Sequence, residues 1–219
     1  MRLIGFGGPA EHGKSTCASL AEEILTSQGY KVKVISFADR LKAACKVIFR
    51  LTDHDLIHPI GKATIKSHLS TTPREVLQKF GTEVCREVLP QYLMTDILRE
   101  AGGIWTWNVE QDILETDADE DTVILIPDVR FPNELAMLRK HGATFINVMR
   151  PRHLNLNLNH VSEAGLTGAD YTIINDGDLS DLKTNVISNL TLIFNFNFNF
   201  NFNFNCTYPE AEDPYAPPF

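Results

Sequence analysis

The chain has 219 residues, which is enough for one α/β domain with a small insertion and for a sizeable apolar core. Its formal net charge of −8 argues against broad nucleic-acid binding, which needs a basic face, but not against a small phosphorylated ligand. The four cysteines form no CxxC pair, and no segment has eighteen apolar residues. We therefore expect no zinc site, no membrane contact and an intracellular, reducing compartment.

The first fifty residues predict a strand, a loop, a helix, a second strand and a second helix. Residues 1–6 are a short apolar run, and residues 14–28 place apolar side chains at helical spacing. Residues 32–37 read as a strand, and 39–50 as a helix that begins with Asp39 as its N-cap. This order predicts a parallel sheet with helices on both faces.

The remaining elements follow the same alternation, although the pattern of residues 51–72 is ambiguous. Pro73 suits the first turn of a helix, and the acidic run from Asp112 to Asp121 reads as an exposed loop. Further strands are expected at 122–127, 143–149 and 170–174. Helices are expected at 73–88, 90–100, from Ile104, 132–141 and 178–190.

Residues Gly8 to Ser15, which read GPAEHGKS, fit the phosphate-binding loop pattern GxxxxGK[ST] between the first strand and the first helix. In such a loop, backbone N–H groups and the helix N-terminus hold phosphate oxygens. Lys14 would bridge the β- and γ-phosphates of ATP, and the Ser15 hydroxyl would bind Mg²⁺. The residues assigned to the donor nucleotide are Gly8, His12, Gly13, Lys14, Ser15 and Thr16.

Four further stretches occur in a fixed order after this loop: SFADRLK at 36–42, REVLQKFGTE at 74–83, PDVRFPNE at 127–134, and HVSE at 160–163 with NDG at 175–177. With the phosphate-binding loop they resemble the bacteriophage-type deoxynucleoside monophosphate kinases over residues 1–190. The resemblance implies a three-layer P-loop kinase fold with a helical acceptor-binding insertion and a lid. It implies transfer of the γ-phosphate of ATP, with Mg²⁺, to a deoxynucleoside monophosphate, in the host cytoplasm if a virus encodes the chain.

The resemblance also assigns the acceptor site. Lys42, Arg74 and Arg130 would grip the acceptor phosphate, because cations must converge before two phosphate groups can approach. Gln78, Gly81 and Thr82 would line the nucleoside pocket, where the base would stack on Tyr92 or pack on Met94. Asp128 could orient Mg²⁺ through water or hold Arg130 by a bidentate pair, and Glu134 could cap its helix or fix an acceptor contact.

A lid is expected at 150–168, where Arg150 and Arg152 could stabilise charge on the transferring group, and the adenine would rest at Asn175 and Asp176. The catalytic residues are then expected to be Lys14, Arg130, Asp128 and Arg150. A 5′-phosphate is mostly deprotonated at neutral pH, so we expect no general base. The kinase domain is predicted to span 1–193, with acceptor-binding helices at about 51–116.

From Phe194 to Asn205 the chain alternates Phe and Asn, and it then ends in a Pro-rich acidic stretch. We expect residues 194–219 to be a low-complexity, disordered tail. An alternating strand could also pair with a second subunit, so a homodimer is one expected assembly. Two other functions fit the residues: another small-molecule P-loop kinase, such as a phosphomevalonate kinase, or a non-catalytic nucleotide-binding module.

Overall fold

The computed structural model describes residues 1–93, 95–151 and 166–195. Its centre is a parallel sheet of five strands in the order β2-β3-β1-β4-β5. The strands are β1 (Arg2–Gly7), β2 (Lys31–Val34), β3 (Thr122–Val129), β4 (Thr144–Met149) and β5 (Tyr171–Ile174). Pairing of Ile4 with both Leu125 of β3 and Thr144 of β4 places β1 in the middle. The predicted parallel α/β fold is confirmed.

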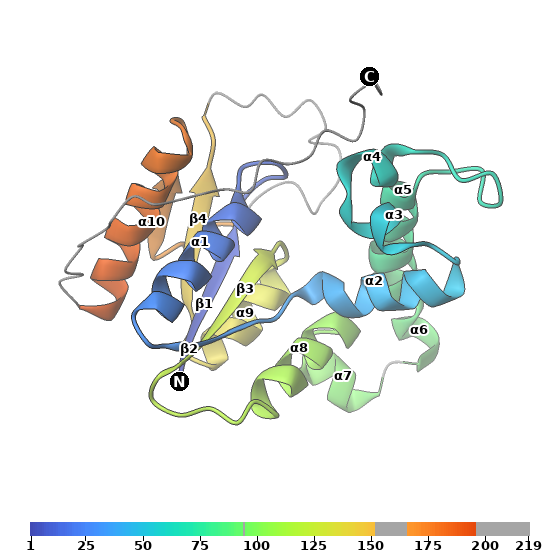
Figure 1. The fold of residues 1–219 in the computed structure, drawn as a ribbon. Coiled ribbons are helices and arrows are strands. Elements are labelled where there is room, and N and C mark those ends of the chain that lie inside the picture. The colour runs from blue at the N-terminus through green and yellow to red at the C-terminus, as the bar shows by residue number, and fades with distance from the viewer. Residues whose placement is uncertain (94, 152–165, 196–219) are drawn as a thin grey trace, which may run out of the picture.

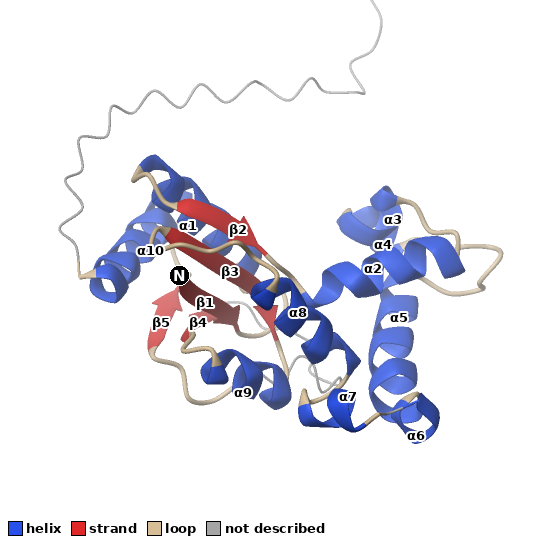
Figure 2. Ribbon diagram, turned by 90° about the horizontal axis from the view of Figure 1, so that it is seen from below, coloured by secondary structure: helices blue, strands red, loops and turns tan. Residues whose placement is uncertain are grey.

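Helices cover both faces of the sheet (Figures 1 and 2). On one face α1 (Lys14–Ser27) and α10 (Leu179–Phe194) share an apolar core with the strands. On the other face lie α8 (Ile104–Leu114) and α9 (Pro132–Lys140), whose buried side chains pack on Ile124 and Phe145. The three layers follow from strands that are apolar on both sides, as β3 is.

A group of short helices extends beyond the sheet (Figure 1). It begins with α2 (Phe37–Ile48), and the small core of the group centres on Cys45, Leu51, Leu56 and Val76. The other members are α3 (Asp53–Ile57), α4 (Pro59–Ala63), α5 (Pro73–Gln78), a π-helix η1 (Lys79–Val88), α6 (Pro90–Leu93) and α7 (Asp96–Glu100). None of the helices described is both long and apolar enough to cross a membrane.

Several predicted element boundaries are wrong. The second strand ends at Val34, and the N-cap of α2 is Ser36 rather than Asp39, because the Ser36 hydroxyl accepts the N–H of Ala38. The helix predicted at 73–88 is divided between α5 and η1. The helix predicted at 90–100 is two pieces, the second of which starts at a Thr95 cap.

The acidic loop and the final helix also differ from the prediction. Asp112 and its two successors belong to α8, where Ile113 is buried against the sheet, so the exposed loop is shorter. The final helix runs four residues beyond 190 and ends with Phe194, whose side chain is 2% exposed. The remainder of the predicted tail lies outside the described residues.

Candidate active site

The phosphate-binding loop connects β1 to α1, as its motif predicts. Gly8 and Gly13 have φ values of 128° and 99°, which side-chain-bearing residues rarely adopt. A Cβ atom on Gly8 would lie 2.3 Å from the carbonyl oxygen of Val148, and one on Gly13 would lie 2.5 Å from the Asn175 amide nitrogen. Both positions therefore require glycine, because β4 and the end of β5 pack directly against the loop.

Lys14 is the first residue of α1, and its ammonium group donates to the carbonyl oxygens of Gly8 at 2.8 Å and Pro9 at 2.6 Å. These bonds fold the side chain back over the loop. Ser15 and Thr16 follow at the helix N-terminus, where unpaired N–H groups favour anions. The predicted donor-phosphate residues are thus brought together by one turn of chain.

Two buried polar residues, His12 in the loop and Asn175 after β5, fix the position of the loop by hydrogen bonds. The His12 ring accepts the backbone N–H of Arg150 at 3.0 Å through Nδ1, and the Asn175 side chain donates to the carbonyl oxygen of His12 at 3.0 Å. The amide of Asn175 is therefore used to hold the loop. Asp176 follows it at an exposed position. The predicted adenine contact of these two residues stays a prediction.

A cavity made of two adjoining chambers, which share part of their lining, lies beside the loop. The phosphate-loop chamber, of about 490 Å³, is lined by Ala10, Glu11, Gly13, Lys14, Thr16, Arg74 and Arg150. The helical chamber, of about 430 Å³, is lined by residues that include Phe37, Lys42, Gly81, Thr82, Arg86, Trp105, Phe131 and Glu134. Both chambers are lined by Ser15, Lys62, Leu77, Gln78, Pro127, Asp128 and Arg130. The lining residues Pro127, Asp128 and Arg130 place both chambers at the carboxyl end of β3, where open α/β sheets bind ligands.

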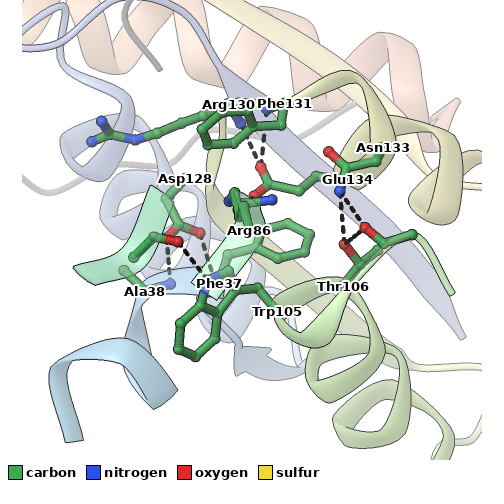
Figure 3. Close-up of polar contacts among 12 residues, drawn as sticks. Phe37, Ala38, Arg86, Trp105, Thr106, Asp128, Arg130, Phe131, Asn133 and Glu134 are labelled. Atoms are coloured by element: carbon green, nitrogen blue, oxygen red, sulfur yellow. Dashed lines mark hydrogen bonds and ion pairs between the residues drawn. The ribbon is translucent and has the colours of Figure 1, made fainter. Parts of the chain in front are cut away.

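Asp128 fixes the start of α2 (Figure 3). Its Oδ2 atom accepts the Ser36 hydroxyl at 2.7 Å and the Ala38 N–H at 2.9 Å, and its Oδ1 atom accepts the Phe37 N–H at 3.0 Å. A carboxylate offers about four lone-pair positions, so these three bonds leave about one position, enough for a single further donor such as a water molecule. The sequence suggested a magnesium or an arginine partner for Asp128 and missed this capping role.

Glu134 is 1% exposed and caps the start of α9, one of the two roles predicted for it. Its Oε2 atom accepts the backbone N–H groups of Arg130 at 2.8 Å and Phe131 at 3.1 Å. Burial raises the pKa of the Glu134 carboxyl, and the guanidinium of Arg86 opposes that shift. Arg86 forms an ion pair with Glu134 and stacks 3.9 Å from the Phe131 ring centroid. The sequence did not indicate Arg86.

Figure 3 shows the side chain of Arg130 extending away from the pair formed by Arg86 and Glu134. Arg130 lines both chambers, whereas Lys42 lines the helical chamber and Arg74 the phosphate-loop chamber. Lys62 of α4, which no motif indicated, lines both and is half-buried. The three cations predicted for the acceptor phosphate and Lys62 therefore come from four separate segments to line these chambers.

The predicted nucleoside residues Gln78, Gly81 and Thr82 do line the helical chamber. Tyr92 does not: its side chain is 80% exposed, so the predicted stacking of a base on Tyr92 is wrong for this arrangement. The aromatic lining comes instead from Phe37, Trp105 and Phe131. The indole N–H of Trp105 donates to the carbonyl oxygen of Gly81 at 2.9 Å, which ties α8 to η1. Met94 lies outside the described residues.

Arg150 lines the phosphate-loop chamber, at the start of the predicted lid. Arg152 and most of that lid lie outside the described residues. In the part of the chain that is described, no group of three or more His, Cys, Asp or Glu side chains could hold a metal ion. The Ser15 hydroxyl and the Asp128 carboxylate, which line both chambers, match what Mg²⁺ usually takes from a phosphate site: one or two protein oxygens beside phosphates and water.

A family model described as deoxynucleotide monophosphate kinase matches residues 22–186, three quarters of the chain. The chain belongs to this family. A protein of Acanthamoeba polyphaga mimivirus, provisionally named a deoxynucleotide monophosphate kinase, is 29% identical over 196 residues, which cover 86% of this chain and 95% of that protein.

Two phage enzymes of the family match shorter stretches. The deoxynucleoside-5′-monophosphate kinase of Escherichia phage T5 is 31% identical over 127 residues, covering 54% of this chain and 45% of that protein. The deoxynucleotide monophosphate kinase of Enterobacteria phage T4 is 37% identical over 71 residues, covering 32% and 29%.

Proposed function

We propose that this protein transfers the γ-phosphate of ATP to a deoxynucleoside 5′-monophosphate and releases the diphosphate and ADP. The observation that carries the proposal is the cavity of two chambers, which joins a phosphate-binding loop to a chamber with cationic and aromatic lining. Membership of the deoxynucleotide monophosphate kinase family supports the acceptor class.

The phosphate-loop chamber would take the triphosphate of ATP. Backbone N–H groups of Gly13 to Thr16 would hold the β-phosphate, and Lys14 would leave the loop carbonyls to contact the β- and γ-phosphates. Mg²⁺ would be held by the Ser15 hydroxyl, with Asp128 acting through water, and would neutralise charge that develops on the phosphates. Arg150, which lines the same chamber, would contact the same phosphates.

The helical chamber would take the monophosphate. Its phosphate would lie toward the phosphate-loop chamber and face Lys42, Arg130 and the Arg74 that lines that chamber. Its base would lie among Phe37, Trp105 and Phe131 beside Gln78. These rings favour a nucleoside over a small aliphatic phosphate, the alternative suggested by a phosphomevalonate kinase. Arg86 and Glu134 form the inner wall, held by their ion pair.

In the transfer step an oxygen of the acceptor phosphate forms the new P–O bond to the γ-phosphorus. The bond from that phosphorus to the β–γ bridging oxygen breaks, and ADP leaves with the electron pair. The acceptor oxygen is already deprotonated at neutral pH, so no side chain has to remove a proton. The chain's contribution is alignment and charge neutralisation by Lys14 and Arg130.

A coupled assay of ADP release, run with each deoxynucleoside monophosphate, tests the function. Lys14→Ala should lower the rate by about 10³–10⁵-fold with an unchanged circular dichroism spectrum. Lys140→Ala, which removes an exposed lysine of α9, should leave the rate unchanged. Absence of ADP release by the wild-type chain with every monophosphate would overturn the proposal.

A further inference from the structure

Lys62 differs from other lysines of the helical region in its lack of a carboxylate partner among the described residues. Lys46 pairs with Asp53, Lys66 with Asp55 and Lys79 with Glu75. The ammonium group of Lys62, by contrast, has no hydrogen-bond acceptor or carboxylate partner within the residues that the structure describes. An unpaired and half-buried lysine is unfavourable, because burial removes its hydration without a compensating anion.

The surroundings of Lys62 increase that cost. Burial lowers the pKa of its ammonium group, and the positive charges of Lys42, Arg74 and Arg130 lower it further. These neighbours come from α2, from α5 and from the residue after β3. A cluster of this kind is stabilised when an anion with several charges enters it.

The position of Lys62 shows which part of the ligand would meet it. Lys62 lines both chambers, together with Ser15, Asp128 and Arg130. Residues shared by both chambers lie at the junction between the donor and acceptor sites of the proposed function. A lysine offers three donors around one compact charge and can therefore bind oxygens of two neighbouring phosphate groups.

We propose that Lys62 is a further substrate-binding residue, whose ammonium group contacts the acceptor phosphate where it faces the γ-phosphate of the donor. The inference rests on the proposed function and extends it by assigning a role to α4. Because α4 lies in the helical region and not in the loop or the lid, Lys62 would align the two phosphates from the acceptor side.

The test compares Lys62→Met, Lys62→Arg and the control Lys46→Met, which removes an exposed, paired lysine of α2. Lys62→Met should lower kcat/KM for the monophosphate by roughly 10²-fold, as expected when one partner of a desolvated charge pair is lost. Binding of ADP, which lacks the γ-phosphate, should be unchanged. Lys62→Arg should recover part of the loss because it restores the charge, and Lys46→Met should behave as wild type.

A pH profile adds a readout that a purely structural role would not move. KM for the monophosphate should rise at alkaline pH in the wild type as Lys62 loses its proton, and Lys62→Arg should abolish that rise. Among the residues described, the charges that act on Lys62 are those of Lys42, Arg74 and Arg130. The adjoining helix α5 also carries Glu75, which pairs with Lys79. The adjoining helix α3 carries His54 and the paired carboxylates Asp53 and Asp55.

The two hypotheses fail in different ways. Wild-type activity with a monophosphate decides the proposed function. The ratio of kcat/KM for the monophosphate between the Lys62 variant and the wild type decides the role of Lys62. Should the wild type be inactive, equilibrium binding of each monophosphate to the same variants still decides whether Lys62 contacts the acceptor. Unchanged kcat/KM and unchanged binding in Lys62→Met would overturn the inference, and so would an equal loss of ADP binding.

Discussion

The carboxylate of Asp128, in β3, accepts a hydrogen bond from the Ser36 hydroxyl at 2.7 Å, and these residues are 92 positions apart in the sequence. With the N–H groups of Phe37 and Ala38, this contact ties the start of α2 to the end of the central strand. Lys42 is one and a half turns further along α2, so Asp128 sets the direction from which that cation enters the cavity.

We expect Asp128→Asn to lose stability as well as activity. An asparagine amide presents N–H groups to the donors on α2, so at least one backbone N–H loses its acceptor, at a cost of about 1–3 kcal/mol. Urea unfolding and kcat measure the two effects, with Asp117→Asn, an exposed loop change, as control. If raised Mg²⁺ restored full activity in a variant of wild-type stability, Asp128 would act mainly through the metal.

Arg130→Ala should impair use of the monophosphate much more than binding of ATP. Arg130 lines both chambers, and the backbone N–H that positions it is held by Glu134, which the substitution leaves in place. We expect kcat/KM for the acceptor to fall by roughly 10²-fold, while the Kd of ATP changes by no more than about threefold. Arg99→Ala, an exposed change in α7, is the matched control. Equal losses for both substrates would contradict an acceptor role.

Asp55 makes the stability of the helical region sensitive to acid. Hydrogen bonds from Lys66 and Thr52 lower the pKa of Asp55 from 3.8 to about 2. Because the folded-state pKa is depressed, the stabilisation is fully present above about pH 4 and is lost as the pH falls toward 2. The difference in urea midpoint between wild type and Asp55→Asn should therefore shrink from pH 5 to about pH 2. Asp53→Asn, which changes the exposed carboxylate that pairs with Lys46, is the matched control.

The elements that sequence predicts well are those whose signals are local. The apolar run of β3 and the glycine spacing between β1 and α1 can each be read from a single stretch. The cap of α2 could not be chosen in this way, since Ser36 and Asp39 are both good capping residues. What selects Ser36 is the hydrogen bond that its hydroxyl donates to the Asp128 carboxylate. That bond depends on how the sheet brings distant segments together.

The residues of the candidate site also differ in whether a local sequence pattern indicates them. Lys42, Arg74 and Arg130 lie within motifs and were predicted, and the structure brings them to one cavity. Lys62 lies in a segment without clear periodicity, and nothing local distinguishes it from Lys66 four residues later. Lys66 pairs with Asp55, whereas Lys62 has no partner among the residues that the structure describes, and this difference is the basis of the role proposed for Lys62. The pair of Arg86 and Glu134 joins residues 48 positions apart and has no local signature.

The last prediction concerns where the kinase domain ends. The predicted boundary after residue 193 separates Phe194 from the rest of α10. The Phe194 ring nevertheless packs edge-on against Tyr30, with 5.1 Å between ring centroids, and the Arg2 guanidinium lies 4.4 Å from the centroid of the Phe194 ring. Arg2 also donates to the carbonyl oxygen of Ile193 at 3.2 Å. The first strand, the turn between α1 and β2 and the last helix therefore meet at this residue.

Two truncations that differ by two residues should behave differently. A chain that ends after Asn195 should keep the kinase rate and stability of the full chain, because residues beyond 195 contain no lysine or arginine that could contact phosphate. A chain that ends after Ile193 should lose about 3–5 kcal/mol of unfolding free energy through loss of the buried ring. Full-length Phe194→Ala separates loss of the ring from the effect of a new chain end. If the chain that ends after Asn195 were folded but inactive, the Phe/Asn repeat would support the site. If that chain were active but formed particles of lower mass than the full chain, the repeat would be an assembly segment.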